Sequence, residues 1–122
     1  MKAELKSQDC LAHDPIEAWI PADPAAVDYQ LTMHIGPLGG KGAEMFMVHV
    51  LTEAAAQRLP AAELISLKKI VLEHYSWTAV SAAIQEILSD AVGPDWESIA
   101  RKLVGSFDWE FDNYQPYQAR LP

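Results

Sequence analysis

The fold is decided by residues 95–114, whose sequence is DWESIARKLVGSFDWEFDNY. Its first half predicts a short helix, because Asp95 can cap the helix start and apolar residues then recur at helical spacing. Glu97 lies in the first turn, where the helix dipole favours a negative charge. Gly105 supplies a stop signal at the end of the helix. The apolar positions of this helix are Trp96, Ile99, Ala100, Leu103 and Val104.

In residues 107–112 the pattern changes to a period of two, which is typical of a β-strand. Aromatic side chains take one face of this strand and carboxylates take the other. Of the aromatic residues Trp96, Trp109, Tyr114 and Tyr117 near the carboxylates, Trp109 is the one that we expect to be buried. A strand with an acidic outer face is suited to meeting a basic partner. The two faces carry Phe107, Trp109 and Phe111 on one side, and Asp108, Glu110 and Asp112 on the other.

The chain before this stretch alternates between strand and helix patterns. A loop with three prolines and about one turn of helix is expected over residues 14–24. Residues 36–43 predict the glycine-rich tip of a hairpin, and Thr52 is expected to cap a short alanine-rich helix that ends near Pro60. Ser76 can cap a second, regular helix up to residue 91. Further strands are expected over residues 2–10, 28–35, 44–51 and 67–75, the last of them apolar enough to be central in the sheet.

This order of elements predicts an α+β fold. We expect a single, mostly antiparallel sheet of about five strands, with two or three helices packed on one face. The length of 122 residues suits one domain, 1–122, with a real hydrophobic core. The tail after about residue 115 contains prolines and is expected to be loose.

The composition narrows the class of partner. Seventeen acids against nine lysines and arginines give a net charge of -8. This charge disfavours nucleic acid and anionic membrane surfaces, whose binding needs basic residues, and it favours basic proteins. No signal-peptide pattern and no apolar run long enough to span a bilayer is visible, so we expect a cytoplasmic protein. Cys10 is the only cysteine, which leaves no internal disulfide.

The sequence contains no convincing active site. The run from Gly39 to Gly42 includes Lys41 but lacks the spacing and the Ser or Thr of a phosphate-binding loop, and it joins two strands. A lone cysteine near the terminus is more often a small hydrophobe than a nucleophile. We therefore expect no catalysis, no metal and no cofactor. The histidines, which lack the spacing of metal ligands, are His13, His34, His49 and His74.

The acidic segment is the remaining candidate for a functional surface. Residues 86–112 carry seven acids against Arg101 and Lys102, a local charge of -5 out of -8. On charge alone, this segment is as consistent with a solvated face as with a binding patch. Exposed aromatic rings beside the carboxylates would favour the binding patch. The candidate contact residues are Asp108, Glu110, Asp112 and Glu97, with Tyr114 as an aromatic anchor.

Over nearly its whole length the chain resembles the immunity protein 8 family of bacterial polymorphic toxin systems. The likeness lies in the order and spacing of several short motifs, whereas residues 53–66 depart from it. The motifs are residues 1–7, the Pro21-Ala22-Asp23-Pro24 turn, the hairpin from Ile35 to Glu44 with Phe46, Asp95-Trp96, Ile99-Ala100, Lys102-Leu103 and the run from Trp109 to Tyr114.

The resemblance implies a small α+β protein that binds and neutralises a cognate toxin, without catalysis or cofactor. Nucleases are among the toxins of such systems, and an acidic inhibitor suits a cationic nuclease because it can mimic phosphate charge. Two alternatives stay open. One is an α+β enzyme or small-ligand domain with a site between sheet and helices. The other is a self-associating module that forms a homodimer through an exposed strand such as residues 2–10.

Overall fold

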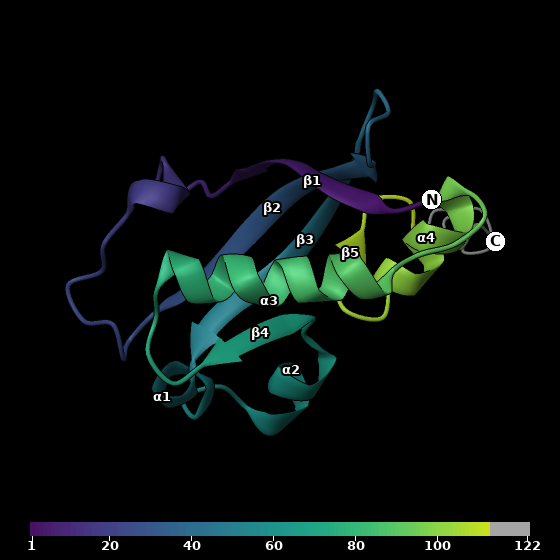
Figure 1. Cartoon of the computed structure of the whole chain (residues 1–122). Helices are drawn as coiled ribbons and strands as arrows, with labels where there is room; N and C mark the ends of the chain where they lie inside the picture. The colour runs from purple at the N-terminus through teal and green to yellow at the C-terminus, as the bar shows by residue number, and fades with distance from the viewer. Residues whose placement is uncertain (113–122) are drawn as a thin grey trace, which may run out of the picture.

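A five-stranded sheet forms the centre of the computed structural model, which describes residues 1–112 (Figure 1). The strands run in the order β1-β2-β3-β4, and β5 pairs with β3. All pairs are antiparallel except β3 with β4, which is parallel. The predicted α+β fold with a mostly antiparallel sheet is confirmed. The strand bounds are β1 Ala3–Asp9, β2 Asp28–Pro37, β3 Glu44–Thr52, β4 Lys69–Leu72 and β5 Asp108–Trp109.

The hairpin of β2 and β3 forms as the alternating pattern predicts. In β2, alternate side chains from Tyr29 to Ile35 are buried, and in β3 Phe46, Val48 and Val50 join the same core. The glycine-rich tip brings two backbone segments very close together. A Cβ atom at Gly36 would lie 2.2 Å from the carbonyl oxygen of Gly42. Only glycine fits this close approach.

Two helices pack against the core face of the sheet. These are α3, Trp77–Asp90, and α4, Trp96–Leu103 (Figure 1). Both start at the predicted caps, because the side chain of Ser76 accepts a hydrogen bond from the Ala79 N–H and that of Asp95 accepts one from the Ser98 N–H. Their inward residues fill the main core together with the sheet. The buried helical residues are Val80, Ile84, Leu88, Ile99, Ala100 and Leu103.

The segment after β3 forms two short helices, where the sequence predicted one. They are α1, Glu53–Ala56, and α2, Ala61–Ser66, and their residues cluster around Leu51 apart from the main core. Thr52 stands at the N-cap position of α1, as predicted, but its side chain makes no capping hydrogen bond. The Thr52 hydroxyl instead donates to the Ala25 carbonyl at 2.7 Å and accepts from the Val27 N–H at 3.2 Å. It therefore fastens the end of β3 to the chain before β2.

The predicted central strand over residues 67–75 is wrong in both length and position. The observed β4 has four residues and lies at an edge of the sheet, parallel to β3. Ile70 is buried, whereas Val71 on its other face is 41% exposed. Tyr75 leaves the strand and donates its backbone N–H to the Pro24 carbonyl. An apolar run shows that a strand is partly buried but does not show how many neighbours it has.

The predicted strand over residues 107–112 is also shorter than expected. Only Asp108 and Trp109 pair with β3, and the N–H of Asp112 then bonds to the Trp109 carbonyl to close a turn. Trp109, which we expected to be buried, is half-buried, and Phe107 is fully buried. Phe111 is 44% exposed, so the aromatic face does not continue to it.

Candidate protein-binding surface

The acidic end of the sheet is built from β5 and the turn that follows it. Asp108 and Glu110 are exposed and Asp112 is half-buried. Glu110 lies beyond the paired residues of β5 but is still hydrogen-bonded to the start of β3. Its backbone N–H donates to the Met45 carbonyl at 3.0 Å, and its carboxylate accepts from the Met45 N–H. The structure thus places Asp108 and Glu110 at one sheet edge, with the Glu110 carboxylate partly engaged by backbone.

The other predicted contact residues differ in their placement. The Glu97 side chain is 78% exposed on the first turn of α4, with Arg101 4.0 Å away. The Arg101 guanidinium lies 5.6 Å from the centre of the Trp109 ring, a cation–π distance. This surface therefore carries one basic side chain among its acids. Tyr114, the predicted aromatic anchor, lies outside the described residues, as does the tail after residue 115.

Two tryptophans hold the acidic end against the core through one carboxylate. Glu44 Oε1 accepts a hydrogen bond from Trp96 Nε1 at 2.7 Å and another from Trp109 Nε1 at 3.2 Å. Trp96 belongs to α4, Glu44 to β3 and Trp109 to β5, so the carboxylate joins three elements. Sequence reasoning missed this role of Glu44, because no local pattern connects positions so far apart in the chain.

Asp108 borders a sheet face that the main core does not use. It pairs with Met47, which in turn pairs with Thr32, so these three side chains form a row across β5, β3 and β2. The next row pairs Met45 with His34. We call this the open sheet face; its described side chains are half-buried or exposed, in contrast to the buried set on the other side. It comprises Gln30, Thr32, His34, Met45, Met47 and His49.

A comparison with known protein families decides what kind of molecule this is. A sequence profile described as Immunity protein 8 matches residues 3–114. The chain belongs to the Immunity protein 8 family. The predicted resemblance is confirmed over this range. No curated protein and no solved structure matches the chain significantly.

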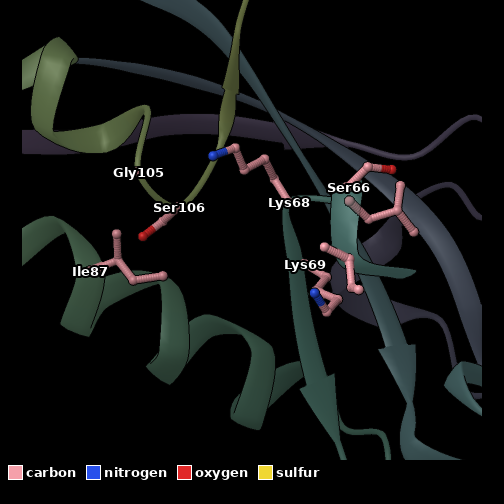
Figure 2. A pocket seen from close by; sticks show the side chains of 8 residues that line it. Ser66, Lys68, Lys69, Ile87, Gly105 and Ser106 are labelled. Carbon is pink, nitrogen blue, oxygen red and sulfur yellow. The ribbon is translucent and has the colours of Figure 1, made fainter. Parts of the chain in front are cut away.

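Several hollows on the surface of this immunity protein are open to solvent. One of about 350 Å³ lies between α3, the segment before β4 and the loop after α4 (Figure 2). Ile87, Lys68 and Ser106 surround it, with Lys69 and Ser66 on the same side as Lys68. Its described lining contains neither a histidine nor a carboxylate, so it offers no general base for hydrolysis.

The two histidines of the open sheet face have polar partners on neighbouring residues, but the two pairs do not form a catalytic triad. Ser7 Oγ lies 3.2 Å from His34 Nδ1, while Asp28 contacts a different histidine, His49. A triad needs one histidine between nucleophile and acid. Among residues 1–112, no three His, Cys, Asp or Glu side chains converge to hold a metal ion. Within the same residues, no helix has the length and apolarity to cross a membrane.

Proposed function

We propose that this immunity protein binds a cognate bacterial toxin domain in the cytoplasm of the producing cell and neutralises it by covering its working surface. The observation that carries the proposal is the open sheet face, bordered by the exposed carboxylates of Asp108 and Glu110, in a chain of net charge -8. A partly exposed sheet face with two adaptable methionines and an acidic border suits contact with a basic protein. An inhibitor that neutralises a toxin by binding and blocking it needs no catalytic activity.

The finer proposal is that the toxin is a basic nuclease. An enzyme that binds phosphates carries a positive surface, and an acidic inhibitor reaches such a surface rapidly and competes with its substrate. Asp108, Glu110, Asp112 and Glu97 are the proposed charged contacts, and Tyr114 is the proposed anchor. The guanidinium of Arg101 lies beside Glu97 and reduces the negative charge of the surface formed by these proposed contacts.

A homodimer through β1 is a second candidate function, and the shape of β1 weighs against it. The pairing of β1 with β2 shifts register between Leu5 and Ser7, which leaves Lys6 as an extra residue in a bulge. A bulge that carries a lysine is a common protection of an edge strand against pairing with another strand. We therefore favour a different protein as the partner.

The test is the binding of the toxin domain encoded beside this gene. A triple variant, Asp108→Asn, Glu110→Gln and Asp112→Asn, is compared with the wild type by stopped-flow association at low salt. We expect association at least several-fold slower, with the difference shrinking as salt is added. The matched control removes three exposed acids elsewhere: Glu53→Gln, Glu63→Gln and Glu73→Gln. An unchanged rate in the triple variant would contradict this placement, and a wild type that binds no toxin would contradict the function.

A further inference from the structure

The connection between β1 and β2 is long and acidic. It spans residues 10–27, beyond the two to five residues typical of a hairpin loop, and contains one 3-10 turn, Ile16–Ala18. From residue 7 to residue 40 the chain holds five acids and no lysine or arginine. Residues 7–40 therefore carry a local charge of -5, equal to that of residues 86–112, and three of their five acids lie within the connection itself. Long ordered loops of this kind are often functional. The five acids are Asp9, Asp14, Glu17, Asp23 and Asp28.

This connection is held in place by an aromatic cluster. The ring of His13 stacks on Trp19, with centroids 3.7 Å apart and planes inclined by 11°. Trp19 also lies edge-on to Tyr29 at 5.9 Å. The hydroxyl groups of Tyr29 and Tyr75 are 2.9 Å apart, which links β2 to the segment before α3. Trp19 is thus fixed before any partner arrives, and a fixed ring binds with little loss of conformational entropy.

A groove of about 340 Å³ lies between this connection and the start of α3. We call it the tryptophan groove. Trp19 of the connection and Trp77 of α3 both line it, together with Ile20, which is 85% exposed. Its described lining contains no basic residue. The residues that matter for the argument are Glu17, Trp19, Ile20, Pro21, Tyr75 and Trp77.

We propose that the tryptophan groove receives an arginine or lysine side chain of the toxin partner. This inference rests on the proposed function and adds a second contact to it. A basic side chain in the groove lies within reach of the Trp77 ring and of the Trp19 ring, one face of which is stacked on His13. The exposed carboxylate of Glu17, which accepts a hydrogen bond from Gln8 Nε2 at 3.2 Å, can pair with the charge of that side chain. The other acids of residues 7–40 add a negative field that attracts the same charge from a distance.

The groove is remote from the acidic end of the sheet. In Figure 1 the purple-to-blue connection between β1 and β2 lies at the left, and α4 with β5 lies at the right. The two surfaces can therefore be disabled separately. Tryptophan and tyrosine are enriched at the energetic centres of protein interfaces and exposed carboxylates are not, so the groove suits such a centre better than the acidic end does.

A direct test uses a small probe in place of the toxin. Acetyl-arginine amide and its neutral counterpart acetyl-citrulline amide are titrated into the full chain, and the indole N–H signals of the tryptophans are followed by NMR. We expect the signals of Trp19 and Trp77 to respond to arginine about two- to fivefold more strongly than to citrulline. Glu17→Gln should remove that preference, whereas Glu63→Gln, an exposed acid on α2, should keep it. Equal responses to both probes would overturn the inference.

A second test uses the toxin domain encoded beside this gene. We expect Trp77→Ala to weaken the complex about tenfold or more, as is usual for an aromatic anchor. Glu17→Gln and Ile20→Ser, both at exposed positions, should weaken it in the same direction without affecting folding. Toxin that binds the wild type and all three variants equally would overturn the inference and leave the proposed function standing. A toxin domain that binds neither the wild type nor any variant would contradict the proposed function. The arginine titration alone would then show whether the tryptophan groove binds a basic side chain.

Discussion

The ring of Trp109 stacks on the ring of Phe46, with centroids 6.0 Å apart and planes inclined by 8°. Phe46 is fully buried in β3, and Trp109 stands between the exposed acids Asp108 and Glu110. The stack therefore anchors the acidic end of the sheet directly on the hydrophobic core. A surface anchored in this way keeps its shape when it is free, which lowers the entropic cost of binding a partner.

Glu44→Ala should destabilise the protein by about 1–3 kcal/mol, because it leaves the indole N–H groups of Trp96 and Trp109 without their shared acceptor. Urea unfolding followed by tryptophan fluorescence measures this change. Glu44→Gln keeps an acceptor oxygen and is the matched control, for which we expect the smaller loss. Equal losses for Ala and Gln would show that the carboxylate charge, and not the acceptor, stabilises this end.

Thr52→Val should also destabilise the protein, by about 1–3 kcal/mol. Valine preserves the shape of the buried side chain but removes the hydroxyl that bonds to the Ala25 carbonyl and the Val27 N–H. Thr52→Ser retains the hydroxyl and should lose less. The free energy of unfolding in urea distinguishes the two. A valine variant as stable as the wild type would mean that these backbone groups find other partners.

The hairpin, the two capped helices and the main core could be predicted from the sequence, because each follows from a local period or a cap. Alternation fixes which residues of β2 are buried. A serine or aspartate before a helical stripe fixes where α3 and α4 begin. These signals lie within about ten residues of each other, so no knowledge of distant partners is needed.

The acidic end and the edge of the sheet could not be predicted in full, because they depend on residues far apart in the chain. The turn at Asp112 interrupts a perfect alternation, and the alternation itself contains no sign of it. The open sheet face was missed because Met45 and Met47 are apolar, so β3 shows no polar side. The groove at Trp19 needs Trp77, which lies on another element.

The protein should lose stability in alkali above about pH 10. Burial raises the pKa of Tyr29 far above its ordinary value of 10.0, and its contacts with Tyr75 add to the rise. Burial raises the pKa of Tyr75 in the same direction. The folded state keeps these protons while the unfolded chain releases them, so stability is full below about pH 10 and falls at higher pH. The limiting slope is about 1.4 kcal/mol per pH unit for each tyrosine.

Urea unfolding between pH 8 and pH 11 measures this slope, and Tyr29→Phe is the informative variant. Phenylalanine cannot ionise, so we expect the slope of the unfolding free energy against pH to be smaller by about the contribution of one tyrosine. The variant also loses the hydrogen bond to Tyr75, which lowers its stability at pH 8. Parallel pH profiles for the two proteins would show that ionisation of Tyr29 does not limit alkaline stability.

Met47→Arg should abolish or strongly weaken toxin binding while leaving the fold intact. Met47 lies at the middle of the open sheet face, beside Asp108 and Thr32, and its side chain is half-buried. A guanidinium there adds bulk and a positive charge to a surface proposed to meet a basic protein, so it repels the partner. Ala82→Arg, at an exposed position of α3, makes a comparable change in charge on the helix side and is the matched control. Titration calorimetry should show at least a tenfold loss of affinity for Met47→Arg and little change for Ala82→Arg. The opposite pattern would move the toxin interface from the open sheet face to the helices.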